Sequence, residues 1–163
     1  MKQQRIIPIK EMGEYLAYDP ESGKITNLKA RRGAAAGAEA GADRGHGYRK
    51  VFFQGAYYYA HRVAWALHYG EQPPAIIDHI DGDGHNNAIS NLRGAAHREN
   101  LQNQKRRIDN TSGHKGVSWN SHAGKWVASC GDVYLGCFND KALASAAYEV
   151  AAIKQFGEYA RLA

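Results

Sequence analysis

A stretch near the middle of the sequence combines the side chains that phosphodiester hydrolysis needs. It contains Asp78 and His79 side by side, followed by Asn91 and Asn100. Hydrolysis requires a base that deprotonates water, positive charge near the phosphate, and help for the departing 3′ oxygen. A histidine can act as the base because its pKa lies near neutral pH. A divalent cation bound by Asp and Asn oxygens can supply the other two. The stretch is therefore a candidate for a metal-assisted nuclease centre.

The acidic turn at residues 81–84, Asp-Gly-Asp-Gly, has an alternative interpretation as a calcium-binding loop. A helix–loop–helix calcium site needs a bidentate Glu at its twelfth position. Counting from Asp81, that position is Leu92, so the calcium-binding interpretation is excluded. A geometric condition applies to Asp78 and His79. Neighbours on a regular strand face opposite ways, so both can serve one site only if the strand ends or bulges there.

The order Asp-His, Asn-Leu-Arg and Glu-Asn over residues 78–100 resembles the HNH endonuclease motif, most closely that of phage and intron-encoded homing enzymes. This resemblance implies a ββα-metal (His-Me finger) core over about residues 76–108, built around one divalent metal ion. The ion implied is Mg²⁺, with Mn²⁺ as an alternative. The resemblance also implies a role for each residue, with Asp78 and Asn100 as metal ligands, His79 as general base and Asn91 as the residue that orients it.

Two details of the resemblance stay open. His97 and Asn103 lie three residues on either side of Asn100, so either could be the second metal ligand if the helix is rotated. Residues 60–65 are similar to the segment that precedes the motif in phage HNH proteins. There we expect His61 to be structural, a histidine at a helix start whose polar atoms have partners.

Hydrophobic periodicity predicts the elements around this motif. We expect hairpins at residues 15–29 and 48–59, the second turning at Gln54-Gly55, and a helix from His61 that ends at Gly70. Residues 30–47, rich in Gly and Ala, are expected to form a mobile loop. Residues 76–93 predict two short strands, and 95–107 predict a polar helix.

A second unit is predicted after the linker-like residues 109–113. Three strand candidates, Gly116–Trp119, Lys125–Ser129 and Val133–Phe138, precede a helix at about 141–156. Residues 112–163 resemble the DNA-binding domain of plant ethylene-response factors, in which a three-stranded antiparallel sheet packs on one helix. The predicted class is therefore α+β, with an HNH nuclease domain at 1–108, including an N-terminal β-hairpin region, and a DNA-binding domain at 112–163.

Composition narrows the class of partner. The formal net charge of +5 is matched by the excess between Lys24 and Lys50, which holds seven basic and two acidic residues. A basic balance is compatible with a polyanionic partner but does not identify one. The HNH resemblance implies double-stranded DNA as the partner, and we expect no protein partner and a monomeric chain. The candidate DNA-binding residues are Arg31, Arg32, Arg49, Lys50, Arg93, Arg98, Lys105, Arg106, Lys115, Ser118, Trp119 and Lys125.

Other classes are disfavoured. Two cysteines do not make a disulfide framework or a four-sulfur zinc site. No apolar run approaches the ~18 residues of a membrane span, so we expect a cytoplasmic protein, in a bacterial host if a phage encodes it. The rival functions are a DNA-binding regulator with an inactive nuclease centre and an RNA nuclease. The RNA nuclease is disfavoured because the sequence lacks an interleaved basic and aromatic platform for stacking RNA bases, apart from Tyr57–Tyr59, whose side chains alternate between strand faces.

Overall fold

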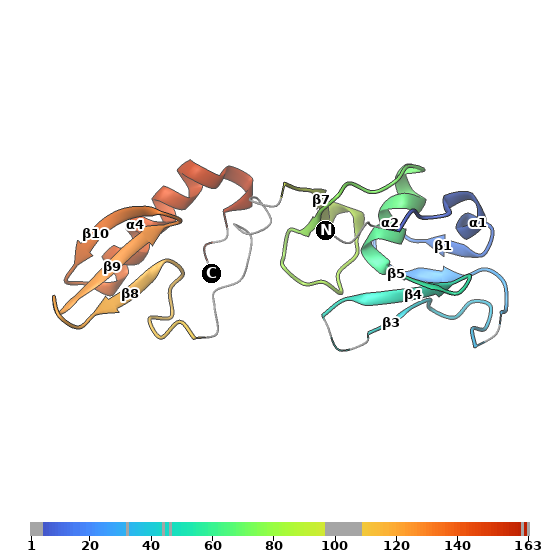
Figure 1. Ribbon diagram of the computed structural model, residues 1–163, viewed down its shortest axis with the longest axis horizontal. Helices are drawn as coiled ribbons and strands as arrows, with labels where there is room; N and C mark the ends of the chain where they lie inside the picture. The colour runs from blue at the N-terminus through green and yellow to red at the C-terminus, as the bar shows by residue number, and fades with distance from the viewer. Residues whose placement is uncertain are drawn as a thin grey trace. The chain divides into compact units, whose positions relative to one another are not determined.

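The computed structural model describes residues 5–31, 33–43, 45, 47–96, 109–160 and 162 (Figure 1). The chain divides into two compact units, Met1–His97 and Arg98–Ala163. Both mix small antiparallel sheets with helices, which confirms the predicted α+β class. The predicted domain boundary near residue 108 lies outside the described residues and stays a prediction.

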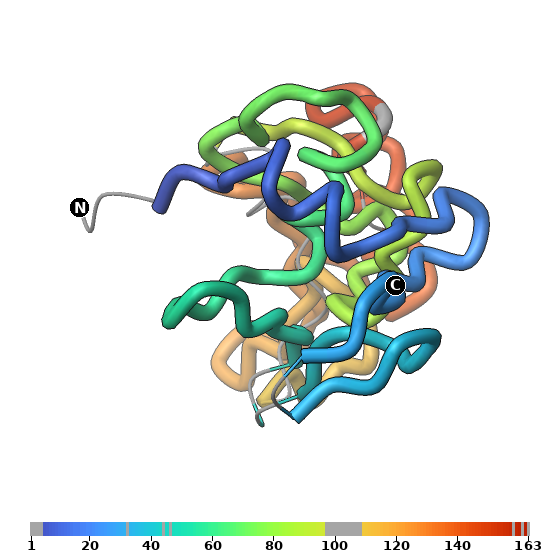
Figure 2. The backbone as a smooth tube through the Cα atoms, turned by 90° about the vertical axis from the view of Figure 1, so that its right-hand side faces the viewer, coloured from blue at the N-terminus to red at the C-terminus, as the bar shows by residue number. Residues whose placement is uncertain are grey.

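The first unit begins with a short helix and a hairpin. Helix α1 spans Ile9–Gly13, and strands β1 (Leu16–Tyr18) and β2 (Ile25–Asn27) pair antiparallel. The turn between them is closed by Asp19, whose carboxylate accepts hydrogen bonds from the Glu21 amide and the Ser22 hydroxyl. Both α1 and β1 contact helix α2, as the backbone trace also shows for α1 (Figure 2).

A three-stranded sheet follows, in the order β3 (Ala42–Asp43), β4 (Arg49–Phe53) and β5 (Ala56–Tyr59). Gln54 and Gly55 join β4 to β5 with φ angles of 45° and 79°. Positive φ at both central residues is the type I′ turn that suits a two-residue hairpin, so the predicted hairpin is confirmed. The Gly- and Ala-rich segment before β4 is more ordered than predicted. It supplies β3, and Asn27 donates a hydrogen bond to the Ala38 carbonyl oxygen.

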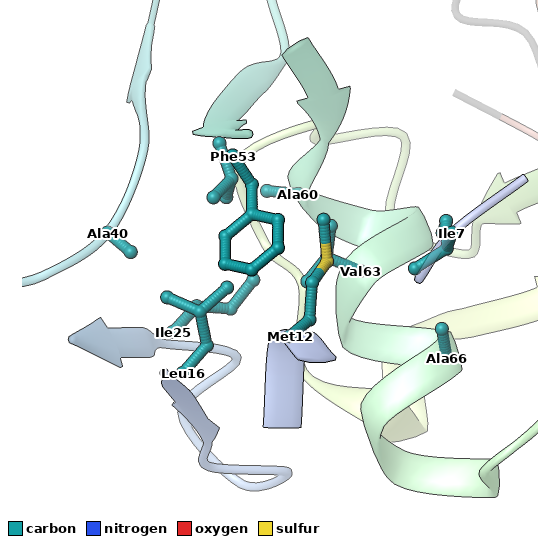
Figure 3. Close-up of a cluster of buried hydrophobic side chains, with 10 residues drawn as sticks. Ile7, Met12, Leu16, Ile25, Ala40, Phe53, Ala60, Val63 and Ala66 are labelled. Atoms are coloured by element: carbon teal, nitrogen blue, oxygen red, sulfur yellow. The ribbon is translucent and has the colours of Figure 1, made fainter. Parts of the chain in front are cut away.

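Helix α2 (Ala60–Tyr69) crosses this sheet and closes the core of the first unit. Gly70, at φ 70°, ends the helix where the sequence predicts. Met12, Leu16, Ile25, Phe53 and Val63 point toward one another beneath it (Figure 3). Burying each such side chain contributes about 1.5–3 kcal/mol, so this cluster anchors the elements that carry the candidate site.

The motif strands come next. Strand β6 (Ile77–His79) pairs antiparallel with β7 (Leu92–Gly94), and the one-turn 3₁₀ helix η1 (Ile89–Asn91) leads directly into β7. These are the two strands of the predicted ββα-metal core. The predicted helix at 95–107 lies almost entirely at residues 97–108, outside the described part of the chain.

The second unit is a three-stranded antiparallel sheet with a helix. Strands β8 (Val117–Asn120), β9 (Lys125–Cys130) and β10 (Val133–Phe138) stand in the order β10–β9–β8, and helix α4 (Lys141–Phe156) packs on them before the 3₁₀ helix η2 (Gly157–Tyr159). Asp140 caps α4 by accepting from the amides of Ala142 and Leu143. The three strands and one helix predicted for this segment are confirmed.

Candidate functional site

Asp78 and His79 occupy the last two positions of β6, and both are buried, with 4% and 5% of their surfaces exposed. The strand ends at His79. Its carbonyl oxygen accepts from the Gly82 amide in a tight turn, while the Ile80 amide donates to the carbonyl oxygen of Asn91. Gly82 has a φ of 67°, which favours glycine at this bend. The condition that the strand ends at the Asp-His pair is therefore met.

Arg93 balances the buried charge of Asp78. The two residues face each other across β6 and β7, and the Arg93 Nε donates to Asp78 Oδ2 at 2.9 Å while Nη2 lies 2.8 Å from the same oxygen. The exposed fraction of the Arg93 side chain is only 13%. In the structure its guanidinium holds the carboxylate of the adjacent strand, and the predicted contact of Arg93 with DNA stays a prediction.

Asn87 contacts the imidazole of His79. Its Oδ1 lies 3.2 Å from His79 Nε2, and its Nδ2 donates to the His85 carbonyl oxygen at 3.3 Å. Because Nδ2 is the donor toward His85, Oδ1 is the atom that faces His79, and it can only accept. With the amide in this orientation, the contact is a hydrogen bond when His79 Nε2 carries the proton, and the lone pair of the neutral ring is then on Nδ1.

The backbone at Asn87 is fixed by the β1–β2 hairpin. The Tyr18 hydroxyl donates to the Asn87 carbonyl oxygen at 2.8 Å. Gly23 approaches so closely that an added Cβ would lie 2.3 Å from the Ala88 nitrogen, and its φ of 72° also favours glycine. The N-terminal hairpin thus determines where the hydrogen-bond partner of His79 stands.

Asn91 closes the loop that follows His79. Its Nδ2 donates to Asp81 Oδ1 at 2.9 Å and to the Asn86 carbonyl oxygen at 2.8 Å, and its Oδ1 accepts from the Asp81 amide at 3.0 Å. These bonds give Asn91 a role in shaping the loop around His79. Its predicted direct action on the histidine ring stays a prediction.

Several aromatic rings pack beside the imidazole of His79. The ring centroids of His61 and Tyr48 lie 5.1 and 5.8 Å from that of His79, and Tyr59 stacks on His61 at 5.5 Å. Burial, followed by the nearby His79 and Arg62, lowers the pKa of His61 to about 3. His61 stands at the start of α2 as predicted, but within the described residues its buried Nδ1 has no hydrogen-bond partner, which differs from the expectation.

Burial also lowers the pKa of His79, although the hydrogen bond with Asn87 and the charges of three aspartates raise it in part. One of these, Asp81, is exposed. Burial raises its pKa, but hydrogen bonds from the Asp83 amide, Asn86 and Asn91 together hold the pKa below its usual value. His79 is therefore neutral near pH 7 and stands within the field of ionised carboxylates, which is the state that a general base requires.

The predicted metal ligands are only partly within the described chain. Asp78 offers a buried carboxylate, the type of oxygen donor that Mg²⁺ takes. Among the described residues, no three His, Cys, Asp or Glu side chains cluster as metal ligands. The predicted ligand Asn100 and its alternatives His97 and Asn103 lie outside the described residues, as do the predicted DNA contacts Arg32, Arg98, Lys105 and Arg106.

The basic candidates of the first unit lie around β4. Arg49 pairs with Glu39 at 2.9 Å, and Arg31 donates to Asn27 Oδ1 at 3.0 Å. The Lys50 ammonium lies 4.8 Å from the centre of the Tyr59 ring. All three are half-exposed, so a phosphate can still reach them.

The candidates of the second unit divide between the two faces of its sheet. Ser118 and Lys125 are exposed on the face away from α4. Trp119 is in register with Trp126, which packs into the core under α4, so the Trp119 ring lies on the helix side and is half-exposed. Lys115 precedes the sheet and is half-buried.

Tyr48 and Asn87 were not among the predicted site residues. The sequence offers one signal for Asn87, its place in the polar Asn86-Asn87 pair inside the motif. Tyr48 lies in the bend just before β4, and an added Cβ on Gly84 would meet its ring at 2.7 Å. Such a contact depends on tertiary packing, so the sequence alone gives no sign of it.

Comparison with known proteins finds similarities for this part of the chain. Residues 58–102 match the family model of HNH endonucleases. The chain is also 43% identical over 67 residues to Protein 3.8 of Escherichia phage T7, an alignment that covers 40% of this chain and 55% of that protein. Among solved structures it is similar to the HNH homing endonuclease I-HmuI, from a study of DNA binding and cleavage. That likeness has a TM-score of 0.45 and 24% identity, and covers 62% of this chain and 57% of the other.

The segment that matches the HNH endonuclease model includes Asp78, His79, Asn91 and Asn100. The family match ends before residues 112–163, whose resemblance to ethylene-response factors stays a prediction. Among the described residues, no helix is long and apolar enough to cross a membrane.

Proposed function

We propose that this protein is a metal-dependent DNA endonuclease of the homing HNH type, which hydrolyses phosphodiester bonds of duplex DNA. The observation that carries the proposal is the arrangement around His79. A buried, neutral histidine at the end of β6 has its proton fixed on Nε2 by Asn87, beside the buried carboxylate of Asp78. The family match of the surrounding segment supports the same chemistry.

In the proposed reaction, His79 Nδ1 takes a proton from the attacking water. The ring then becomes an imidazolium, and its Nε2–H bond to Asn87 Oδ1 becomes charge-assisted, which roughly doubles its strength. Asp78, Asp81 and Asp83 stabilise the same positive charge. Asn91 holds the loop that keeps Asp81 close to the ring. The attack breaks the bond between phosphorus and the 3′ oxygen, and the departing oxygen takes a proton from a second water, so the products are a 5′ phosphate and a 3′ hydroxyl.

The residues present suit a divalent cation. Asp78, Asp81 and Asp83 all act electrostatically on His79, and Arg93 offsets one of these negative charges at Asp78. Asp78 and Asn100 would hold the ion, most simply Mg²⁺ with Mn²⁺ as an alternative. When bound, such an ion neutralises charge on the phosphate and on the leaving 3′ oxygen.

The second unit is proposed to raise the affinity for DNA. Ser118 and Lys125 lie on the exposed face of its sheet, where a groove of DNA could approach. Tethering a weak second binder raises overall affinity by up to about 10²–10⁴-fold when the geometry permits. One active site per chain favours nicking by a monomer.

Nicking of supercoiled plasmid DNA with Mg²⁺ tests the proposal. The wild-type chain should nick, chelation of the metal should stop it, and His79→Ala should lower kcat by about 10²–10⁴-fold with DNA affinity nearly unchanged. His122→Ala, in an exposed turn of the second unit, is the control for loss of an imidazole elsewhere. DNA binding without any nicking would instead support a regulator with an inactive centre. A folded His79→Ala variant that cuts within a few-fold of wild type would exclude His79 as the base.

A further inference from the structure

The outward face of the β4–β5 hairpin carries large aromatic rings in water. Phe52 is 51% exposed and Tyr57 47% exposed, and the two face each other across the hairpin. Their neighbours on β4, Val51 and Phe53, point the other way into the core. The strand alternation therefore places both rings on one surface by construction, and that surface needs an explanation because folding does not bury it.

The two rings make a pair that is open to a flat ligand. Their centroids lie 4.9 Å apart with an angle of 51° between the planes. They border an open hollow of about 510 Å³ that is also lined by Arg31 and Lys50. Among the described residues, Glu39 is the one acidic side chain of this lining, and Arg49 neutralises it through an ion pair of 2.9 Å. The hollow thus combines exposed aromatic rings with a net positive charge.

The same face is continuous with the candidate active site. Lys50 is in register with Tyr59 one step along the hairpin, and its ammonium lies 4.8 Å from the centre of that ring. The Tyr48 ring lies 5.9 Å from that of Tyr59 and 5.8 Å from that of His79. A row of side chains therefore leads from the Phe52–Tyr57 pair to the proposed base.

The geometry points to a binding site for single-stranded DNA, in which unpaired bases stack on Phe52 and Tyr57 while Lys50 and Arg31 contact the backbone phosphates. Aromatic rings can use the flat face of a base only when that base has left its stack, whereas a duplex offers base edges and phosphates. This inference rests on the proposed nuclease function. It adds that the substrate includes a single-stranded stretch, which the row through Tyr48 directs toward His79.

The test measures binding separately from cleavage. Fluorescence anisotropy with a labelled oligothymidine and with a duplex of matched length is recorded on the full-length chain carrying His79→Ala. Each base–aromatic stack contributes about 5–150-fold in affinity. Phe52→Ala and Tyr57→Ala should therefore each weaken single-strand binding by that factor and duplex binding much less. Tyr57→Phe keeps the ring and should bind like the parent.

Matched controls keep the outcome interpretable. Tyr69→Ala removes a tyrosine that is 50% exposed at the end of α2, away from the hairpin, and should leave single-strand affinity unchanged. Lys50→Ala should weaken binding and flatten its salt dependence, because one phosphate contact is lost. Circular dichroism and a thermal melt show that each variant is folded.

Several results would overturn the inference while leaving the nuclease proposal intact. One is unchanged single-strand affinity in folded Phe52→Ala and Tyr57→Ala. Another is an equal loss for single strand and duplex, which would indicate general electrostatic attraction. Tighter binding of an RNA strand of the same length would refute the assignment to DNA. A wild-type dimer that Phe52→Ala dissociates would assign the face to a second copy of the chain.

Discussion

Asn87→Ala removes one acceptor from the candidate base and nothing else from the reacting groups. In the wild type, Asn87 Oδ1 faces His79 Nε2 at 3.2 Å, and this contact requires the proton on Nε2. The variant keeps the backbone at position 87, whose carbonyl oxygen still accepts from Tyr18. The ring of His79 should then lose its fixed tautomer, so that part of the population has its lone pair on the wrong nitrogen.

The size of the effect follows from the change in charge during the reaction. A hydrogen bond between neutral groups contributes about 0.5–1.5 kcal/mol and one to a charged group about 1.5–3 kcal/mol. The bond to Asn87 therefore gains about 1–1.5 kcal/mol when His79 becomes an imidazolium. At 1.36 kcal/mol for each factor of ten, its loss lowers kcat by roughly tenfold. KM should change little, because Asn87 is buried and makes no contact with DNA in the proposed reaction.

Two measurements check this prediction. Nicking kinetics give kcat, and ¹⁵N NMR of the imidazole distinguishes the two tautomers of His79 in the metal-free protein. Tyr18→Phe is the matched comparison, since it loses a hydrogen bond to the same residue and keeps the acceptor. It should lower stability by about 1 kcal/mol and leave the tautomer signal in place. A wild-type spectrum with the proton on Nδ1, or an Asn87→Ala variant with unchanged kcat, would refute the reasoning.

Two further predictions concern the metal and the buried histidines. Asp78→Ala should abolish nicking at any Mg²⁺ concentration, whereas excess Mg²⁺ should partly restore nicking by Asn100→Ala, because loss of a neutral ligand lowers the affinity for the metal without removing charge. Titration of the nicking activity against Mg²⁺ checks this. Normal activity of Asn100→Ala together with an inactive Asn103→Ala would assign the second metal ligand to Asn103. Unfolded His61 takes up a proton as the pH falls below 6.5, while the folded residue does so only near pH 3. The free energy of unfolding should therefore decrease by about 1.4 kcal/mol for each unit by which the pH is lowered between these values. Urea melts at a series of pH values give the free energy of unfolding as a function of pH. This free energy should change less steeply with pH in His61→Phe than in His122→Ala, and an equal pH dependence in the two variants would contradict the burial of a neutral His61.

The sequence was most informative where local chemistry decides the structure. The Gln54-Gly55 turn gives the hairpin because a two-residue loop needs positive φ at both positions. The Asp-His pair is located by its own residue types and by the motif around it. The three strands and helix of the second unit follow from turn residues and periodicity in the same way.

The contacts between secondary-structure elements were harder to predict from the sequence. Arg93 was predicted to bind DNA, which stays a prediction, and its position opposite Asp78 follows from the register of β6 with β7. That register depends on the length and folding of the loop between the strands. Asn86 and Asn87 are the same residue type side by side, and only the fold decides that the second one meets His79 while the first holds Asp81. Strand β3 lies in a segment that was predicted to be a loop. It is a strand because its backbone pairs antiparallel with β4.

The distribution of charge suggests how the first unit divides its work. Around His79 the described carboxylates outnumber the guanidinium of Arg93, so the chain's own charges there do not attract a phosphodiester. Positive groups lie instead along β4 and the segment before it, at Arg31, Arg49 and Lys50. In the proposed function, DNA attraction and hydrolysis thus belong to neighbouring parts of one unit. The basic face can hold a strand by its phosphates, while the acidic loop keeps the base surrounded by charges that favour its protonated form. A site that was basic throughout would bind DNA more tightly but would oppose the transfer of a proton to His79.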